Sequence, residues 1–314
     1  MQAGSDMQGQ EHAQQPTEIH AGMPTARSWR PVPLLVGSVV LHAALLLLVL
    51  WRPTLWLWCL LAVALNHALI VALVFVPRSS WLGKAVTRLP ASAVTQGWVA
   101  LTFDDGPDPV VTPQVLDVLD RYQAKASFFC IGTAVQQYPD LLREIAARGH
   151  SIENHGHAHS SFFAFWGGKR MRQDIMRLQH AVQALTGSWP RFFRPTAGFR
   201  NPLLDRVLAR TGLHLVMWTR RGFDTRCGDA ETVRQRLLRQ LAAGDILLLH
   251  DGHAARTAQG EPVALAVLPD LLHALRARNL QAVTLRQGLA DLTADSMQEA
   301  AVLSSTTTPS RTTP

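Results

Sequence analysis

Two uncharged apolar runs, separated by only three residues, constrain this chain more than any other feature of its sequence. They cover residues 34–51 and 55–76, and each is long enough to cross a hydrocarbon core of about 30 Å as a helix. Neither run shows the polar face that a core helix of a soluble protein usually presents to water. The sequence therefore predicts a transmembrane helical hairpin over residues 33–77.

The predicted hairpin carries a few polar groups within its apolar runs. His42 on the first run and Asn66 and His67 on the second lie at similar distances from the tip. We therefore expect them to share a depth and to hydrogen-bond between the two helices. A cleaved signal peptide fits poorly, because the first run begins beyond residue 30 and a second follows at once. Three tryptophans mark the predicted tip, where an interfacial aromatic belt is expected: Trp51, Trp56 and Trp58.

Positive charge flanks the outer ends of the two runs. Arg27 and Arg30 precede the first run, and Arg52 is the only charged residue at the tip. Three further basic residues follow the second run: Arg78, Lys84 and Arg88. We expect a protein of the cell (inner) membrane with two transmembrane helices, and the positive-inside rule favours a cytoplasmic side for both ends. A bias of five charges against one leaves open on which side of the membrane the large C-terminal domain lies.

Beyond Trp98 the pattern changes to short apolar strands that alternate with amphipathic helices, which is typical of an α/β domain. The strand candidates are WVALTF, ASFFCI, residues 150–153, RFFR, LHLVMW, DILLLH and LQAVTL. We expect a helix that Thr112 caps and that runs to Tyr122, and a helix that ends at Gly149. Four more are predicted at residues 169–185, 202–210, 230–243 and 262–278. About seven repeats favour a distorted (β/α) barrel of parallel strands, in which chemistry lies at the strands' carboxyl ends.

These patterns divide the chain into five parts. The polar residues 1–32 are predicted to be a disordered N-terminal arm, and residues 294–314 a disordered tail. Between them lie the hairpin at 33–77, a linker at 78–97 and the α/β domain at 98–293.

Composition narrows the classes of function. The three cysteines, Cys59, Cys130 and Cys227, stand at unrelated spacings, which argues against a disulfide framework and against a cysteine zinc ribbon. The formal charge of +7 is spread through predicted helices without an aromatic-interleaved patch, so we expect no nucleic-acid partner. A metal in this chain would need other ligands than cysteine.

The first candidate cluster is a pair of adjacent carboxylates, Asp104 and Asp105, at the end of the first predicted strand of the domain. A Gly-Pro turn follows them, so that both side chains could reach one pocket. One carboxylate could bind a metal while the other accepts a proton. An Asp-rich capping turn is the alternative interpretation of this motif.

The second cluster, after the third predicted strand, contains three histidines within five residues. His155 and His159 are four residues apart, and on a helical turn this spacing places two imidazoles on one face. His157, between them, should point elsewhere. Together with Asp105 these two histidines predict a two-histidine, one-carboxylate site with open positions, as a hydrolytic zinc requires.

The third cluster is the apolar strand Ile246–Leu249, which ends in His250. A histidine at this place, with a pKa near neutrality, is suited to donate a proton to a leaving group.

The ordered set of motifs resembles the polysaccharide deacetylases of carbohydrate esterase family 4, which carry the NodB-homology domain. The motifs are TFDDGP, the His-x-x-x-His of the second cluster, Arg194-Pro195-Thr196-Ala197-Gly198, Asp224 and LLLHD. The resemblance covers roughly residues 95–290. It implies a hydrolase of carbon–nitrogen, non-peptide bonds that removes N-acyl groups from the amino sugars of a polysaccharide, an oligosaccharide or a lipid-linked glycan.

The resemblance also implies a role for each matching residue. Metal ligands, most often of Zn²⁺, would be Asp105, His155 and His159. Asp104 would be the catalytic base and His250 the catalytic acid. Arg194 would orient the base, Asp224 would pair with the acid, the backbone N–H of Ala197 would bind the oxyanion, and Leu248 would contact the acetyl methyl group.

The chain departs from the family pattern at two places. Thr196 and Ala197 stand where the family usually has a proline and an aromatic residue, which predicts an altered substrate groove. Gly156 stands where serine or threonine often follows the first metal histidine, so a supporting hydrogen bond is expected to be missing. A non-catalytic, membrane-tethered glycan-binding module with the same fold is the alternative hypothesis. Asp104 and His250 argue against it, because binding alone requires neither.

Overall fold

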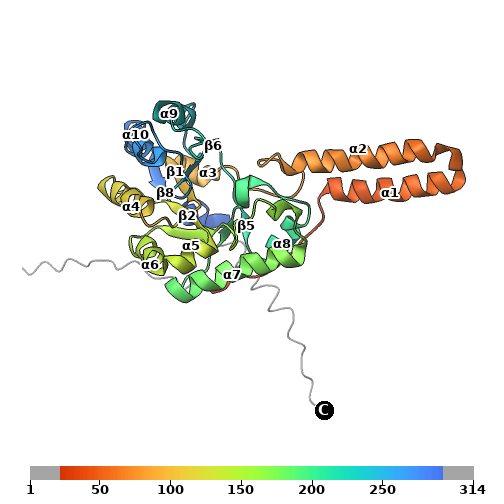
Figure 1. Ribbon diagram of the computed structural model, residues 1–314, viewed down its shortest axis with the longest axis horizontal. Helices are drawn as coiled ribbons and strands as arrows, with labels where there is room; N and C mark the ends of the chain where they lie inside the picture. The colour runs from red at the N-terminus through yellow and green to blue at the C-terminus, as the bar shows by residue number, and fades with distance from the viewer. Residues whose placement is uncertain (1–21, 293–314) are drawn as a thin grey trace, which may run out of the picture.

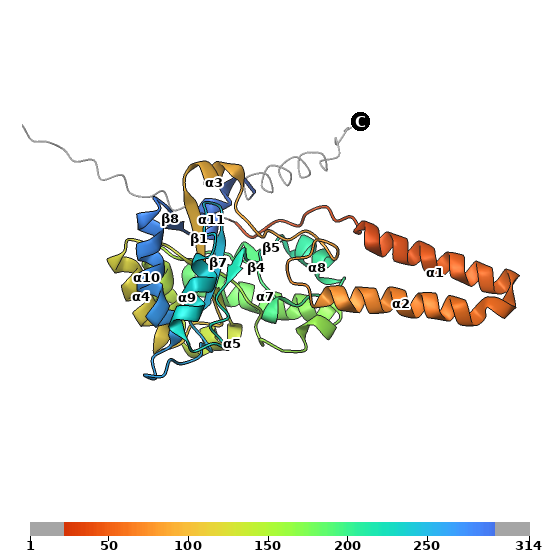
Figure 2. The ribbon, with the colours of Figure 1, turned by 90° about the horizontal axis from the view of Figure 1, so that it is seen from above.

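A computed structural model describes residues 22–292 of the chain. It consists of a barrel-like α/β domain, from one side of which a long helical hairpin projects (Figures 1 and 2). The hairpin helices are α1 (Pro33–Trp51) and α2 (Trp56–Val74), joined by the 3₁₀ turn η1 (Pro53–Leu55). Both are long and apolar enough to cross a membrane, and 0% and 11% of their apolar windows are buried. Such exposure is unlike that of helices in a soluble core.

The polar groups of the hairpin share a depth, as the sequence predicts, but the two histidines hydrogen-bond to backbone carbonyls of their own helices and not between the helices. Asn66 donates a hydrogen bond of 2.7 Å to the hydroxyl oxygen of Ser38 on the opposite helix. The rings of His42 and His67 contact each other edge to face, with 5.2 Å between their centroids. These contacts link α1 and α2 at one depth, and most of the remaining hairpin surface is apolar.

The α/β domain contains eight parallel strands. In the sheet they follow the order β5-β4-β3-β2-β1-β7-β6, and β8 pairs with the first half of β1. Their bounds are β1 (Trp98–Asp104), β2 (Ser127–Cys130), β3 (Ser151–Asn154), β4 (Phe192–Phe193), β5 (His214–Leu215), β6 (Arg220–Arg221), β7 (Ile246–His250) and β8 (Gln281–Val283). The predicted distorted barrel of about seven parallel strands is confirmed.

Helices cover the outside of this sheet. They are α3 (Ala91–Thr95), α4 (Val111–Arg121), α5 (Gly132–Gln137), α6 (Pro139–Ala147), α7 (Gly168–Thr186), α8 (Leu204–Thr211), α9 (Ala230–Leu238), α10 (Val263–Ala277) and α11 (Leu285–Gly288), with the 3₁₀ turns η2 (Phe163–Phe165) and η3 (Thr196–Gly198). The apolar faces of α4, α9 and α10 pack on β1, β2 and β7 in the largest buried cluster. A smaller cluster fills the barrel interior around Phe129, Phe192 and Ile246. Strands buried on both faces explain the continuous apolar runs of the sequence.

The predicted start of α4 is wrong by about two residues. Thr112 was expected to cap this helix, but the cap position is Val110, and the carboxylate of Asp108 accepts hydrogen bonds from the backbone N–H groups of Val110 and Val111. Asp108 satisfies the first free donors of the helix, so the helix begins earlier. Thr112 instead donates to Asp251 at 2.6 Å.

Segments predicted to be an arm and a linker pack on the domain where they are described. Residues 1–21 of the arm and residues 293–314, which include the predicted tail, lie outside the described residues. In the remaining arm the backbone N–H of Arg27 donates to the carbonyl of Ala209, and the indole of Trp29 donates to Asp205. In the linker, Val86 forms a parallel bridge with Val216, just after β5. The linker thus fills the seam between β5 and β6, which do not pair.

Candidate active site

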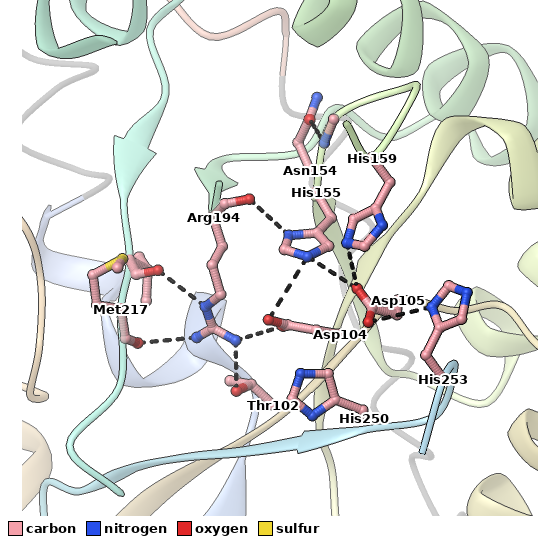
Figure 3. Close-up of polar contacts among 12 residues, drawn as sticks. Thr102, Asp104, Asp105, Asn154, His155, His159, Arg194, Met217, His250 and His253 are labelled. Atoms are coloured by element: carbon pink, nitrogen blue, oxygen red, sulfur yellow. Dashed lines mark hydrogen bonds and ion pairs between the residues drawn. The ribbon is translucent and has the colours of Figure 1, made fainter. Parts of the chain in front are cut away.

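Four of the predicted site residues stand at the carboxyl ends of parallel strands. Asp104 ends β1, and the strand register pairs it with His250, which ends β7. His155 directly follows β3, and Arg194 directly follows β4. Because the carboxyl ends of parallel strands meet at one end of a barrel, side chains from distant segments converge there (Figure 3).

Asp104 is held by a fully buried arginine. One guanidinium nitrogen of Arg194 donates to the carboxylate of Asp104 at 2.6 Å and to the hydroxyl of Thr102 at 3.0 Å. Its other nitrogens donate to the backbone carbonyls of Val216 and Met217. Burial lowers the pKa of Arg194, and the charge of Asp104 opposes that shift. With its donors occupied by four acceptors, the guanidinium gives Asp104 one fixed orientation (Figure 3).

Asp105 turns away from Arg194 and faces three histidines. Its φ of 75° lies in the left-handed region, which aspartate tolerates better than most residues and which turns the chain after β1. One carboxylate oxygen lies 3.1 Å from Nε2 of His155 and 2.9 Å from Nε2 of His159. The other lies 3.4 Å from Nδ1 of His253. Burial raises the pKa of Asp105, but the facing nitrogens of the three histidines lower it more, and the net shift is downward.

The two predicted ligand histidines come together without a helical turn. Residues 155–160 form an irregular loop, and His159 has a φ of 46°. The expectation of a helical turn is therefore wrong, although the rings of His155 and His159 do lie side by side, with 5.2 Å between their centroids. His157 points elsewhere, as predicted, and its ring packs against Gly132.

The backbone conformation of Gly156 and the space around it explain why this loop contains a glycine. Its φ is +82°, and a Cβ at this position would lie 2.8 Å from a carboxylate oxygen of Asp174. The same oxygen accepts a hydrogen bond from the N–H of His157. Gly156 itself donates to the side chain of Asn154 at 2.8 Å. A serine or threonine here would meet both a strained backbone and a close contact, so the loop needs glycine.

The geometry around Asp105 fits a divalent cation. Nδ1 of His155 lies 2.7 Å from the carbonyl oxygen of Arg194, which can only accept, so Nδ1 carries a proton and Nε2, which faces Asp105, is the nitrogen that a metal could bind. The buried Oδ1 of Asp105 has no hydrogen bond of good geometry, although two imidazole nitrogens lie within 3.1 Å. Imidazole nitrogens that converge on a carboxylate are the kind of donor set that a zinc ion requires.

His253 is a member of the cluster that the sequence analysis missed. The ligand atoms of Asp105, His159 and His253 all lie within 4.8 Å of one another. The ring of His253 stacks on that of His159, yet its side chain is 67% exposed. The available signal was a second histidine only three residues after His250. His253 thus borders the predicted ligand set on its solvent side.

The acid side of the site is a second buried pair. Nδ1 of His250 lies 2.9 Å from one carboxylate oxygen of Asp224, and the other oxygen accepts the backbone N–H of His250 at 2.7 Å. Burial lowers the pKa of His250, but the charge and hydrogen bond of Asp224 outweigh it, and the net shift is upward. Since Nδ1 is held by Asp224, Nε2 is the nitrogen of His250 that can exchange a proton within the cavity.

These groups line one cavity of about 350 Å³. The predicted residues that reach it include Asp104, Asp105, His155, His159, Ala197, Leu248 and His250, and Thr196, Gly198, Trp218 and Arg221 complete much of its wall. Arg194 and Asp224 do not line it. They lie behind Asp104 and His250, where they orient the groups that do.

Comparison with known proteins agrees with the fold and site. Residues 91–216 match the family model for polysaccharide deacetylases. The chain is 34% identical over 175 residues to a peptidoglycan-N-acetylglucosamine deacetylase of Bacillus cereus, a match that covers 55% of this chain and 81% of the relative. It is 33% identical to a chitooligosaccharide deacetylase of Sinorhizobium fredii, over 52% of this chain and 76% of the relative.

A solved structure supports the same assignment. The family 4 carbohydrate esterase from Streptomyces lividans, in complex with acetate, superimposes with a TM-score of 0.54 at 30% identity. The match covers 59% of this chain and 91% of that one. A parallel barrel with a carboxylate–histidine cluster at its carboxyl end defines a metal-dependent hydrolase of the α/β class. The chain belongs to the polysaccharide deacetylase family, as the motifs predicted.

Proposed function

We propose that this protein is a metal-dependent hydrolase that removes N-acetyl groups from the amino sugars of a glycan. The observation that carries this proposal is that Asp104 and His250 occupy paired positions on β1 and β7 and face one cavity. Each has its own buried partner, and Asp105 with its histidines lies beside them. The names of the relatives support the reaction, since they are deacetylases of N-acetylated glycans.

Asp105, His155 and His159 are the residues that would hold the metal, most simply Zn²⁺. When bound, such an ion supplies Lewis acidity that activates water and polarises an amide carbonyl. The carbonyl of Arg194, which holds a proton on Nδ1 of His155 and leaves Nε2 toward Asp105, and the low pKa of Asp105 both suit these side chains to bind a cation.

The remaining chemistry belongs to the side chains of the cavity. Asp104, oriented by Arg194, accepts the proton of the water that attacks the amide carbon. The N–H of Ala197 donates to the oxygen on which negative charge develops, and Leu248 contacts the acetyl methyl group. His250 then gives its proton to the departing amine, which is otherwise a poor leaving group. The products are acetate and a free amino sugar.

Acetate release tests this reaction directly. We expect the full chain, purified in detergent and loaded with zinc, to release acetate from N-acetylglucosamine oligomers or from a related N-acetylated glycan. His250→Ala should lose this activity while it keeps the metal. A wild-type chain that holds one zinc ion but releases no acetate from any N-acetylated amino sugar would refute the proposal and favour the non-catalytic glycan-binding module.

We also propose that α1 and α2 anchor the protein in the cell membrane. Their length, their apolar surface and their low burial support this. The charge bias favours a cytoplasmic α/β domain. A topology reporter fused after Met297 should then report a cytoplasmic C-terminus. An exported reporter would reverse the topology and would exclude nascent cytoplasmic glycans as substrates.

A further inference from the structure

We propose that the base of the hairpin packs directly behind the wall of the substrate cavity and supports it, and that the substrate is an N-acylated amino sugar joined through phosphate to a membrane lipid. This inference rests on the proposed function, because it names the class of glycan that the same site deacetylates. Three independent features carry it: the packing of the chain that follows α2 against the back of the cavity wall, a rim of exposed aromatic residues, and two arginines in the cavity.

The chain that leaves α2 packs directly behind the loop η3, which lines the cavity. A Cβ added to Gly198 of this loop would lie only 2.9 Å from the side chain of Pro77. The rings of Phe75 and Phe199 meet edge to face, with 5.1 Å between their centroids. One layer of side chains therefore separates the end of the hairpin from the cavity.

Further contacts fix both helices of the hairpin to the α/β domain. Leu34 at the start of α1 and Leu73 and Val74 at the end of α2 pack against Leu82 and Ala164. Just beyond them, Arg78 donates to the backbone carbonyl of Thr219 at 3.0 Å. The hairpin is thus part of the packed structure at its base, and its direction sets how the domain meets a bilayer (Figure 2).

Exposed aromatic side chains surround this base. We call Trp81, Phe162 and Phe165 the aromatic rim; they are 60%, 69% and 70% exposed. Trp81 and Phe165 are the chain neighbours of Leu82 and Ala164, the residues on which the hairpin packs. Aromatic residues at the end of a membrane-spanning segment lie at the level of the lipid head groups. The rim therefore continues the apolar surface of the hairpin onto the domain.

Basic side chains accompany the rim. Arg78, Lys169 and Arg170 are exposed on the same segments, within a few residues of Pro77, Phe165 and Trp166. Basic residues beside an apolar membrane-entering surface favour anionic lipid head groups. An anionic bilayer is thus the surface that this face of the protein fits.

Two arginines of the cavity have no carboxylate partner among the described residues. Arg221 and Arg226 line it, and among residues 22–292 neither forms an ion pair with a carboxylate. Nε of Arg221 is buried and has no hydrogen-bond partner in the described structure. Its guanidinium is held between the rings of Trp218 and Phe223, at 5.2 and 5.1 Å from their centroids. A fixed guanidinium with free donors is suited to a phosphate oxygen.

Together these features favour a lipid-linked substrate over a distant polymer. A sugar on a lipid phosphate stands at the membrane surface, where the hairpin holds the domain. Such a sugar can reach the cavity while its lipid stays in the bilayer. Its phosphate then supplies the negative charge that Arg221 and Arg226 lack.

The test compares three N-acetylglucosamine substrates with the full chain reconstituted in anionic vesicles. They are polyprenyl-phosphate N-acetylglucosamine in the same vesicles, soluble N-acetylglucosamine 1-phosphate, and a neutral N-acetylglucosamine oligomer. We expect kcat/KM for acetate release to fall at least tenfold from the first substrate to the third. A neutral oligomer hydrolysed as fast as the lipid-linked sugar would overturn the inference and leave the deacetylase function intact. Release from none of them by a zinc-loaded chain would refute the proposed function itself.

Variants separate the phosphate contact from membrane docking. Arg221→Gln should lower the preference for both phosphate substrates over the neutral oligomer about tenfold. Replacing the aromatic rim with serine should lower the preference for the lipid-linked sugar over the soluble sugar phosphate. Val110→Ser removes a similarly exposed apolar side chain, 62% exposed, before α4, and should change neither ratio. Unchanged preferences in the Arg221 and rim variants would contradict the proposal.

A spectroscopic measurement tests the docking without turnover. Subtracting the tryptophan emission of Trp81→Phe from that of the wild type gives the emission of Trp81 alone, without that of the tryptophans at the hairpin tip. In vesicles of lipids brominated near the head group this difference should be quenched, because the rim lies in the interface. An unquenched difference would place Trp81 in water and would overturn the docking.

Discussion

Each of the two flanks of the cavity is a buried pair of one basic side chain and one carboxylate. The two flanks differ in which member of the pair faces the cavity. On the β1 side, a buried arginine lies behind a carboxylate, and the carboxylate of Asp104 faces the cavity. On the β7 side, the buried carboxylate of Asp224 lies behind an imidazole, and His250 faces the cavity. In both pairs the partner behind the cavity wall compensates the charge of the member that faces the cavity. Without that partner, the buried charge would be unpaired and would destabilise the folded state. In the proposed mechanism, the member that faces the cavity decides whether the flank accepts or donates a proton.

The largest expected effect comes from the cluster between the two flanks. His155→Ala removes a nitrogen that lies 3.1 Å from Asp105, so the variant should lose both zinc and activity, to the background rate of the assay. Elemental analysis of the purified chain measures the first and acetate release the second. His180→Ala is a control on the exposed surface of α7. Full zinc content in His155→Ala would remove this histidine from the ligand set.

The next largest effect is expected from a variant that disables only the flank that contains Asp104. Asp104→Asn keeps the shape of the side chain and its neighbour Arg194 but cannot take a proton, so kcat should fall by about 10²–10⁴. Zinc content should stay near one ion per chain, in contrast to His155→Ala. Asp140→Asn changes a carboxylate that is 94% exposed and should behave as wild type. Unaltered turnover in Asp104→Asn would refute its role as the base.

A smaller effect, visible mainly in the pH dependence, comes from the acid flank. Asp224 raises the pKa of His250, so the protonated acid persists to higher pH and activity is lost as pH rises through that raised pKa. In Asp224→Asn the largest causes that raise the pKa of His250 are lost, and only the charges of Asp104 and Asp105 still oppose its burial, which lowers the pKa. The alkaline limb of kcat should then move to lower pH, with a loss of about tenfold or more at neutral pH. If the alkaline limb of kcat does not move in this variant, the limb does not report the ionisation of His250.

The smallest effect is expected at the exposed edge of the metal cluster. His253 faces the second oxygen of Asp105 at 3.4 Å and is mostly exposed, so His253→Ala should weaken zinc binding by about tenfold. Competition with a chromophoric chelator measures this affinity. A loss as complete as that of His155→Ala would make His253 a ligand in its own right.

Local sequence patterns predicted which strands and helices form better than they predicted where a helix starts or how a loop turns. Strand positions followed from short apolar runs, since parallel strands buried on both faces must be apolar. The start of α4 was misplaced because the first N–H groups of the helix are accepted by the side chain of Asp108, four residues before the predicted cap Thr112. The turn at His155 was misread because four-residue spacing also suits an irregular loop with glycine and histidine at positive φ. His253 was missed because a single histidine in a loop carries no periodic signal.

By itself the sequence determined the apolar hairpin, the parallel α/β barrel and the chemical groups at the strand ends, because each depends on residue type at short spacing. The tertiary structure decided what those groups face. Arg194 reaches Asp104 from 90 residues away, and Asp224 reaches His250 across 26. It also decided that Pro77 packs on Gly198, behind the cavity wall. Such contacts follow from strand order and from packing at the barrel end, which no local pattern encodes.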